Sequence, residues 1–314
     1  MDANSSTNLE FKNVLHLTDF SPCSAEALSW ATSLARLQGA KLFVLNVVIP
    51  DTIVYLAPGA PGVALDMQDE WARGEILRLE EQLSNIPHQL VVERGQDLWR
   101  TVESKLTEWN IDLIVLGTHG RTGLRRVLMG SAAERVLRHS LVPVLTVGPE
   151  VPSGPTHDCQ FQKVLLATDF AEGSAETANY AVSFAQRHRA ELTMVHVCRK
   201  AKRGGTDRSW DLSIAEALHR LHEMVPAASM LQERPDRLVE CGEPGPRILD
   251  VAKRKEVDLI VMGVRDTPRV FAATHMGIST AHEVVAHSPC PVLTIRRPVH
   301  AAVSCLQSAL AESG

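Results

Sequence analysis

The 314-residue sequence lacks the features that several large classes of protein require. No segment approaches the ~18 consecutive apolar residues that a membrane-spanning helix needs. The six cysteines are scattered and form no CxxC pair, so we expect reduced thiols and no disulfide. Lysine and arginine (32) are fewer than aspartate and glutamate (37), and the net charge of −5 argues against general binding of nucleic acid or of an anionic membrane.

The chain also lacks the short motifs of several common enzymes. No GxxxxGK[ST] sequence is present, which excludes a P-loop enzyme, and no GxSxG elbow marks a hydrolase. The GxGxxG sequence of dinucleotide-binding proteins does not follow the first expected strand, where Thr18-Asp19-Phe20-Ser21 stands instead. The segment from Met1 to Asn8 is polar and has no apolar signal-peptide core, and together with the reduced thiols this leads us to expect a cytoplasmic protein.

What the sequence does contain is one unit twice. Three blocks of the first half recur in the second half in the same order. The matching blocks are Phe11–Phe20 with Phe161–Phe170, Ile111–Gly117 with Val257–Gly263, and His139–Thr146 with His287–Thr294. So long a period, with small differences in spacing, indicates a duplicated domain rather than a solenoid.

The segment Gly148–Asp158 contains three prolines and is interpreted as the linker between the copies. We expect a disordered lead-in at 1–10, a first unit at 11–149, a linker at 150–160, a second unit at 161–297 and a C-terminal tail at 298–314.

Each unit alternates strands with helices. In the first unit we expect strands at Val14–Leu17, Lys41–Val48, Gln89–Glu93, Ile111–Leu116 and Val142–Val147, and helices at Pro22–Leu37, Asp66–Leu83, Leu98–Trp109 and Ser131–His139, with a loop at Asp51–Gly62. This alternation predicts an α/β fold, in which a doubly wound, five-stranded parallel sheet is covered by helices on both faces. We expect the strand order 3-2-1-4-5 in each unit.

A glycine-rich segment follows the fourth expected strand. It runs from Leu116 to Gly123 and leads to Gly130-Ser131, where the last helix begins with Ser131 as the expected N-cap. The backbone N–H groups of such a turn, together with the positive end of a helix, suit a phosphate. An ordinary tight turn followed by a helix cap is the alternative interpretation.

Asp19 directly follows the first expected strand. In the order 3-2-1-4-5 the carboxyl ends of strands one and four are neighbours, so Asp19 should lie beside Gly117 and Gly120. We therefore expect one pocket made of Asp19, the glycine turn and Ser131. The Asp19 carboxylate has two interpretations: a local turn former, or a group that faces a ribose hydroxyl or a phosphate-bound Mg²⁺.

Three motifs together resemble the universal stress protein family: Thr18-Asp19-Phe20-Ser21, Asn46-Val47-Val48 and Gly117-x2-Gly120-x9-Gly130-Ser131. The chain looks like a tandem member of its ATP-binding branch, with two domains of the adenine nucleotide alpha hydrolase-like type. The resemblance implies ATP or AMP as the ligand, with or without Mg²⁺. The site residues that it implies are Leu17, Thr18, Asp19, Val47, Leu116, Gly117, Gly120, Arg121, Gly130, Ser131 and Ala132.

Within this implied site, Asp19 would meet the ribose or the metal-bound phosphates, which makes it an indirect metal contact through Mg-nucleotide. Val47 would hold the adenine through its backbone. Leu116 and Gly117 would line the nucleoside, while Gly120, Gly130 and Ser131 would hold the phosphates.

The second unit departs from the pattern. Gly263 is retained, but Asp266 stands at the place of Gly120 and Ile278 at the place of Gly130. A carboxylate beside phosphates and a β-branched side chain in the turn both oppose binding. We expect little or no nucleotide binding there, although Asp169, Val197 and Ser279 remain.

The resemblance also implies an assembly, because family members pair through the last strand. An exposed edge strand invites such pairing, and the duplication supplies a partner within the chain. We expect the strands at Val142–Val147 and Pro291–Ile295 to join the units as an intramolecular pseudo-dimer. The chain is then a pseudo-dimeric monomer or a homodimer of tandem chains.

The function that the resemblance implies is a sensor or regulator in the stress response, with no catalytic residues. One rival is a slow Mg-dependent ATPase, for which Arg121, Arg125 and Arg126 could lie near a γ-phosphate, although no general base is evident. The other rival is an interaction scaffold that needs no nucleotide.

Overall fold

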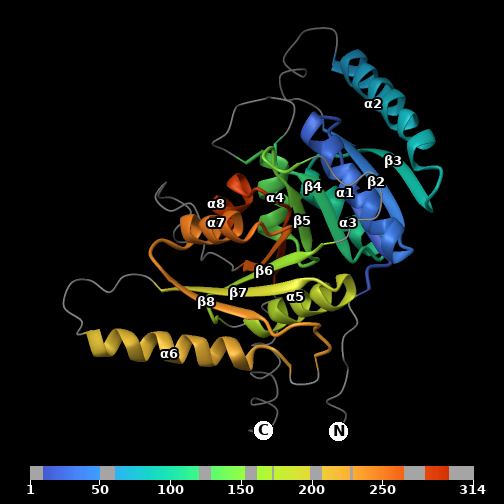
Figure 1. The fold of residues 1–314 in the computed structure, drawn as a ribbon. Helices are drawn as coiled ribbons and strands as arrows, with labels where there is room; N and C mark the ends of the chain where they lie inside the picture. Colours follow the sequence, from blue (N-terminus) through green and yellow to red (C-terminus); the bar gives the residue numbers. More distant parts are fainter. Residues whose placement is uncertain are drawn as a thin grey trace, which may run out of the picture.

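The computed structural model describes residues 10–49, 61–119, 129–152, 161–171, 173–198, 207–226, 229–264 and 280–296, without the side chains of 61–66 and 207–212. Its centre is one ten-stranded sheet with the strand order β3-β2-β1-β4-β5-β10-β9-β6-β7-β8. Helices cover both faces of this sheet (Figure 1). The two units therefore share a sheet instead of folding around separate ones.

The first unit has the predicted topology. Its strands are β1 (Asn13–Leu17), β2 (Lys41–Val48), β3 (His88–Arg94), β4 (Leu113–Gly117) and β5 (Val144–Val147), and its helices are α1 (Pro22–Gln38), α2 (Pro61–Leu83), α3 (Leu98–Glu108) and α4 (Ser131–His139). All neighbouring strands in this half are parallel. The order 3-2-1-4-5 is confirmed.

The second unit repeats this plan. Its strands are β6 (Lys163–Thr168), β7 (Glu191–Cys198), β8 (Asp236–Cys241), β9 (Leu259–Val264) and β10 (Val292–Arg296), and its helices are α5 (Ser174–His188), α6 (Asp207–Glu223), α7 (Pro244–Lys255) and α8 (Thr280–His287). The order β8-β7-β6-β9-β10 matches that of the first unit strand for strand.

Several predicted boundaries need correction. α2 begins at Pro61, so Pro61 and Gly62 belong to a helix that the sequence placed from Asp66 onward. β5 begins at Val144, not at Val142, because Pro143 has no N–H for the ladder, although its carbonyl accepts a bond from Ile114 N at 2.9 Å. Residues 153–160 of the expected linker, the lead-in at 1–9 and the tail lie outside the described residues.

The start of α1 follows the sequence closely. Ser21 is the N-cap, its side chain accepts a bond from Ser24 N, and Pro22 occupies the first helical position. The helix ends at Gly39, which has φ 64° and so takes a left-handed conformation that favours glycine. These signals fix the helix that connects β1 with β2.

Side chains from the sheet pack into two hydrophobic layers. One layer joins the sheet to α1, α2, α5 and α6, through residues such as Leu34, Ile76, Ala178 and Leu221. The other layer joins the sheet to α3, α4, α7 and α8, through Val102, Val136, Val251 and Val284. Because both faces are covered, a central strand such as β4 is apolar along its whole length instead of alternating.

The units meet through their last strands, as predicted. β10 pairs antiparallel with β5, and Leu293 lies opposite Leu145 at the centre of the pairing. Two threonines make equivalent side-chain bonds across this junction: Thr146 Oγ1 donates to Val292 O at 3.2 Å, and Thr294 Oγ1 donates to Val144 O at 3.1 Å. This pairing makes the chain an intramolecular pseudo-dimer.

Aromatic side chains add to the junction on the face of α1 and α5. Trp30 of α1 stacks on Phe161 with ring centroids 5.7 Å apart, and Phe11 meets Phe184 of α5 at 6.0 Å. On the other face, Arg296 Nη2 donates to Leu137 O at 2.7 Å. Contacts on both faces of the sheet therefore hold the two units together.

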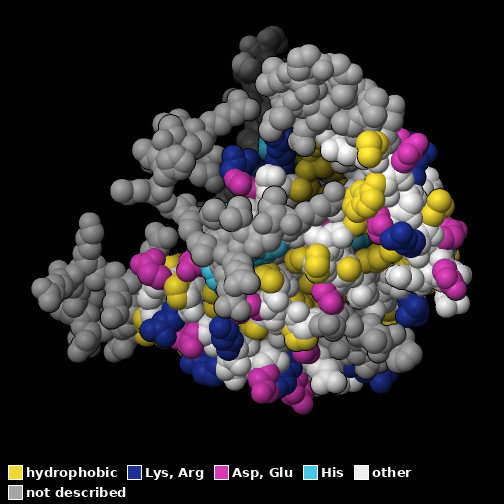
Figure 2. Space-filling view, turned by 90° about the horizontal axis from the view of Figure 1, so that it is seen from above, with side chains coloured by type: hydrophobic (Ala, Val, Ile, Leu, Met, Phe, Trp, Pro, Cys, Tyr) yellow, Lys and Arg dark blue, Asp and Glu magenta, His cyan; other side chains and the backbone are white. Residues whose placement is uncertain are grey.

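The surface carries mixed charge. On the face shown in Figure 2, acidic and basic side chains are interspersed over the part of the chain that is described. Among those residues, no helix is long and apolar enough to cross a membrane.

One buried polar group stands out in β1. His16 is completely buried, and its Nδ1 lies 3.1 Å from Val115 O. A carbonyl oxygen can only accept, so Nδ1 carries the hydrogen, while Nε2 lies 3.4 Å from Ser24 Oγ. Burial lowers the pKa of His16 to about 4, with weaker opposing effects from the Val115 bond and Asp19.

The threonine bonds at the junction provide a first prediction. We expect Thr146→Val and Thr294→Val each to lower the free energy of unfolding by about 1 kcal/mol, because each loses a buried side-chain hydrogen bond across the junction. Urea denaturation measures this. The control is Thr107→Val on α3, because the hydroxyl of Thr107 donates to Glu103 O at 3.4 Å in a bond that is exposed to solvent. Variants at the junction that match this control would contradict the role assigned to the bonds.

His16 provides a second prediction, on pH. Below pH 6.5 the unfolded chain protonates this histidine, whereas the folded chain does so only near pH 4, so stability falls as the pH drops through this interval. The loss reaches about 3 kcal/mol. The matched variant is His16→Leu, because leucine (Leu166) occupies the equivalent position of the second unit.

Urea denaturation of both proteins between pH 7 and pH 4 measures the effect. His188, whose pKa burial and Arg187 lower to about 4, is present in both proteins, so the difference between the two curves isolates His16. Parallel curves would show that His16 does not stay neutral in the folded protein.

Candidate functional site

The carboxyl ends of β1, β2 and β4 lie together at one edge of the sheet. Leu17, the last residue of β1, is in register with Leu45 on one side and Leu116 on the other. Beyond the strand end, Thr18 N donates to Leu45 O at 3.0 Å, and Asn46 Nδ2 donates to Thr18 O at 2.8 Å. These bonds hold the turn after β1 against the end of β2.

The turn after β1 also reaches the segment after β4. Ser21 Oγ donates to His119 O at 3.3 Å, across about a hundred residues of sequence. The Asp19 turn and the beginning of the glycine-rich segment are therefore neighbours in space. This is the adjacency that the strand order 3-2-1-4-5 predicts.

Asp19 has a clear local role. Its Oδ1 accepts a bond from Ser21 N at 3.0 Å, and the hydroxyl of Thr18 accepts one from Phe20 N at 3.0 Å. Phe20, which lies between Asp19 and Ser21, has φ 60°, and this left-handed conformation is uncommon for a residue with a side chain. The interpretation of Asp19 as a turn former is confirmed, and this role also fixes the carboxylate at the end of the strand.

Gly117 must be glycine for steric reasons. A Cβ at this position would lie 2.9 Å from both the carbonyl carbon and the carbonyl oxygen of Cys23 in the first turn of α1. No flexible side chain could move aside, because both atoms belong to the backbone. The close approach of α1 to β4 is therefore possible only with glycine here.

The glycine-rich segment leaves the sheet and returns to it at nearly the same point. Thr118 N donates to Val147 O at 2.9 Å, and Gly130 N donates to Thr118 O at 2.7 Å. Gly130 therefore lies next to the end of β4, and α4 begins there. This arrangement positions a helix N-terminus at the edge that also carries Asp19.

The predicted N-cap of α4 needs correction. Gly130 is the cap residue, with φ −61° and ψ 146°, and it contributes no side-chain bond to this helix end. Ser131 is the first helical residue and is exposed, as is Ala132. Because the first N–H groups of a helix have no partner within it, this end can bind an anion.

The structure describes most of the predicted site residues. At the carboxyl edge lie Leu17, Thr18, Asp19, Val47, Leu116, Gly117, Gly130, Ser131 and Ala132. Leu17 and Val47 are half-buried and pack on the α3–α4 side of the sheet. The remaining predicted residues lie outside the described residues: Gly120, Arg121, Arg125 and Arg126 in the first unit, and Asp266, Ile278 and Ser279 in the second.

His119, in the glycine-rich segment after β4, is half-buried. Its Nδ1 lies 2.9 Å from Thr118 Oγ1. Burial lowers the pKa of His119, and His287 of α8 lowers it further. The edge of the first unit therefore adjoins α8 of the second unit, a proximity that only the sheet junction reveals.

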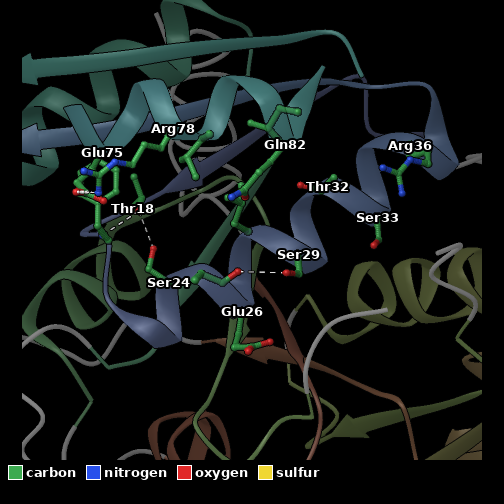
Figure 3. A pocket seen from close by; sticks show the side chains of 15 residues that line it. Thr18, Ser24, Glu26, Ser29, Thr32, Ser33, Arg36, Glu75, Arg78 and Gln82 are labelled. Carbon is green, nitrogen blue, oxygen red and sulfur yellow. Dashed lines mark hydrogen bonds and ion pairs between the residues drawn. The ribbon is translucent and has the colours of Figure 1, made fainter. Parts of the chain in front are cut away.

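Two hollows open next to this edge, and neither contains Gly117 or Gly130. One of about 510 Å³ lies between α1 and α2, with Thr18 and Ser24 at one end and Arg36 at the other (Figure 3). The other, of about 670 Å³, lies between the end of β3 and α3. The candidate site is the place where the carboxyl ends of β1, β2 and β4 converge.

The second unit keeps the turn but changes its surroundings. Asp169 Oδ1 accepts from Ala171 N at 2.9 Å, Thr168 Oγ1 accepts from Phe170 N at 3.1 Å, and Phe170 has φ 57°. His196 replaces Asn46 and bonds to Thr168 O at 2.9 Å. The backbone geometry after the first strand is therefore the same in both units.

A three-layer stack then covers this turn in the second unit. The His196 ring stacks on Phe170 with ring centroids 4.3 Å apart. The guanidinium of Arg220, from α6, lies 4.3 Å from the centroid of the Phe170 ring. Arg220 Nη2 also donates to Phe170 O at 3.2 Å. Sequence reasoning missed this stack, because its three members come from separate elements.

Comparisons with known proteins agree with this architecture. The family model described as "Universal stress protein family" matches residues 10–148 and again 160–296. A Mycobacterium tuberculosis protein, universal stress protein MT2052, is 26% identical over 314 aligned residues, which cover 91% of this chain and 95% of the relative. The similarity therefore extends over both units.

One solved structure superposes over nearly the whole chain and shows the same fold. A universal stress protein from Archaeoglobus fulgidus superposes with a TM-score of 0.61 at 22% identity, covering 91% of this chain and 98% of that one. A universal stress protein solved in complex with cAMP covers 44% of this chain and 98% of its own, at 20% identity and a TM-score of 0.35. With two matches to the family model over most of its length, the chain belongs to the universal stress protein family as a tandem member.

Proposed function

We propose that the first unit binds an adenine nucleotide, ATP or AMP, at the carboxyl edge of β1, β2 and β4, and that the chain acts as a sensor or regulator in the stress response. The bond from Gly130 N to Thr118 O is the observation that carries this proposal. It sets the N-terminus of α4 beside the end of β4, on the edge that holds the Asp19 turn. A helix N-terminus and a carboxylate thereby lie at the same edge of the sheet.

The phosphates would lie at the start of α4. Ser131 and Ala132 are exposed, and the Gly130 cap has no side chain that could compete for the first N–H groups of the helix. These donors and the positive end of the helix dipole favour a phosphate. Because Gly130 has no side chain, it leaves space for the phosphate.

The nucleoside would lie along the strand ends. Leu17 and Val47 are half-buried apolar side chains on the same face of the sheet. At Gly95, in the neighbouring turn, a Cβ would clash first with the Thr101 side chain and would lie 3.3 Å from Val47 Cγ1, so this turn lies close to Val47. Asp19 is held at the strand end by its bond from Ser21 N, within reach of a ribose or of Mg²⁺ bound to phosphate.

We expect one nucleotide per chain. In the second unit the Arg220–Phe170–His196 stack covers the equivalent turn. The sequence also has Asp266 and Ile278 where the first unit has Gly120 and Gly130. Both differences disfavour a phosphate in the second unit.

A substitution at the α4 cap tests the proposal by isothermal titration of Mg·ATP and of AMP. Wild type should bind with a stoichiometry near one per chain, and Gly130→Val should bind at least ten-fold more weakly. Valine tolerates φ −61° and ψ 146°, so the chain should still fold, with the modest loss of stability expected at an N-cap. Binding should weaken because the valine side chain would occupy the space proposed for the phosphate.

The matched control is Gly148→Ala, at the end of β5, where a Cβ would make only an ordinary contact of 3.6 Å with Val285 O. It should bind like wild type. Two equivalent sites per chain would contradict the asymmetry of the units. Absence of saturable binding in wild type would contradict the proposal and favour a scaffold that needs no nucleotide.

Turnover provides a separate test, because the proposed role is regulatory. We expect no release of phosphate from Mg·ATP above that of buffer. The diagnostic variant is Asp19→Asn, which keeps an oxygen for the bond from Ser21 N and removes the charge. Turnover that wild type shows and this variant loses would replace the regulatory role with that of a slow ATPase.

A further inference from the structure

Two cysteines far apart in sequence lie side by side in the second unit. Cys198 is the last residue of β7 and Cys241 is the last residue of β8, and the two are register partners in the parallel pairing. Gly242 N donates to Cys198 O at 3.0 Å, which fixes this register at the strand ends. The sequence, in which no two cysteines form a CxxC pair, gives no sign of this proximity.

Both side chains project from the same face of the sheet. Side chains alternate along a strand, and His196, two residues before Cys198, stacks on Phe170, which packs against the α5–α6 layer. Val239, two residues before Cys241, packs against that same layer. The two thiols therefore face the α6 side together.

The spacing suits a disulfide. Neighbouring strands are about 4.8 Å apart, and disulfides join Cα atoms that are 4.4–6.8 Å apart. Both thiols are free and partly exposed. Among the other described cysteines, Cys290 is buried and Cys23 donates to Val147 O at 3.2 Å.

The pair belongs to the second unit alone. Val48 and Arg94 are the register partners at the same place in the first unit, where Gly95 follows as Gly242 does in the second. There Arg94 pairs with Asp69 of α2 at 3.2 Å. The two thiols are therefore not a requirement of the shared fold.

We propose that Cys198 and Cys241 form a reversible disulfide that links edge strand β8 to β7, with a hydroperoxide as the oxidant. One thiolate attacks a peroxide oxygen, which gives a sulfenic acid and releases an alcohol or water. The second thiol sulfur then attacks the sulfenic sulfur and releases water. The pair loses two electrons and two protons in total, and a dithiol reductant reverses the reaction by exchange.

A disulfide fits this pair better than a metal does. The described residues contain no group of three or more histidine, cysteine or carboxylate side chains placed to hold a metal ion. Burial, and to a lesser extent Cys241, raise the pKa of the Cys198 thiol. Less of Cys198 is thiolate at neutral pH, so we expect oxidation to speed up as the pH rises from 7 to 9.

The full chain, treated with hydrogen peroxide, tests the proposal without any substitution. Remaining thiols are alkylated, the protein is digested without reductant, and the peptides are identified by mass. We expect one cross-linked species that joins the peptides of Cys198 and Cys241, lacks two hydrogens and disappears with dithiothreitol. A mixture in which both thiols stay alkylatable, or pair with other cysteines or other chains, would overturn the proposal.

Variants then assign the reaction. Cys198→Ser and Cys241→Ser should each abolish the cross-link and leave the remaining thiol to form overoxidised or intermolecular products, while Cys23→Ser should cross-link like wild type. A cross-link that persists in either strand variant would overturn the assignment. The reaction does not depend on nucleotide binding, so its outcome and that of the titrations can differ.

Discussion

The structure depends above all on the parallel pairing of β1 with β4, which come from opposite ends of the first unit. With Leu17 opposite Leu116, the turns that follow both strands meet at one edge. Ser21 then reaches His119, and Gly130 returns to Thr118. A shift in this register would separate the Asp19 turn from the N-terminus of α4, and the candidate site would not exist.

The pairing of β5 with β10 extends this principle to the whole chain. It turns two edge strands into the centre of one sheet and brings α8 next to His119. Protecting an edge strand is a general need of open sheets, and duplication meets it within a single chain. The second unit thus supports the first. The carboxyl edge of its own strands keeps the turn at Asp169. The Arg220 stack and the cysteine pair lie there in place of the surroundings of Asp19.

The sequence predicts the fold well because the fold rests on local and repeated signals. Apolar strands, capped helices and the recurring blocks determine the topology, and the order 3-2-1-4-5 is confirmed in both units. The predicted ends of two elements were less accurate: β5 begins only after Pro143, which has no N–H, and α4 is capped by Gly130 instead of Ser131. The burial of His16 and His119 and the meeting of Cys198 with Cys241 were missed, since they depend on which strands and helices become neighbours.

The central claim is that the carboxyl edge of the first unit, and not that of the second, holds the nucleotide. Amide hydrogen exchange of the full chain, with and without saturating Mg·ATP, tests it most directly. The account predicts slower exchange around Thr18–Ser21 and Gly130–Ala133, with no change around Thr168–Ala171. Equal protection of both turns, or no protection at the start of α4, would contradict it.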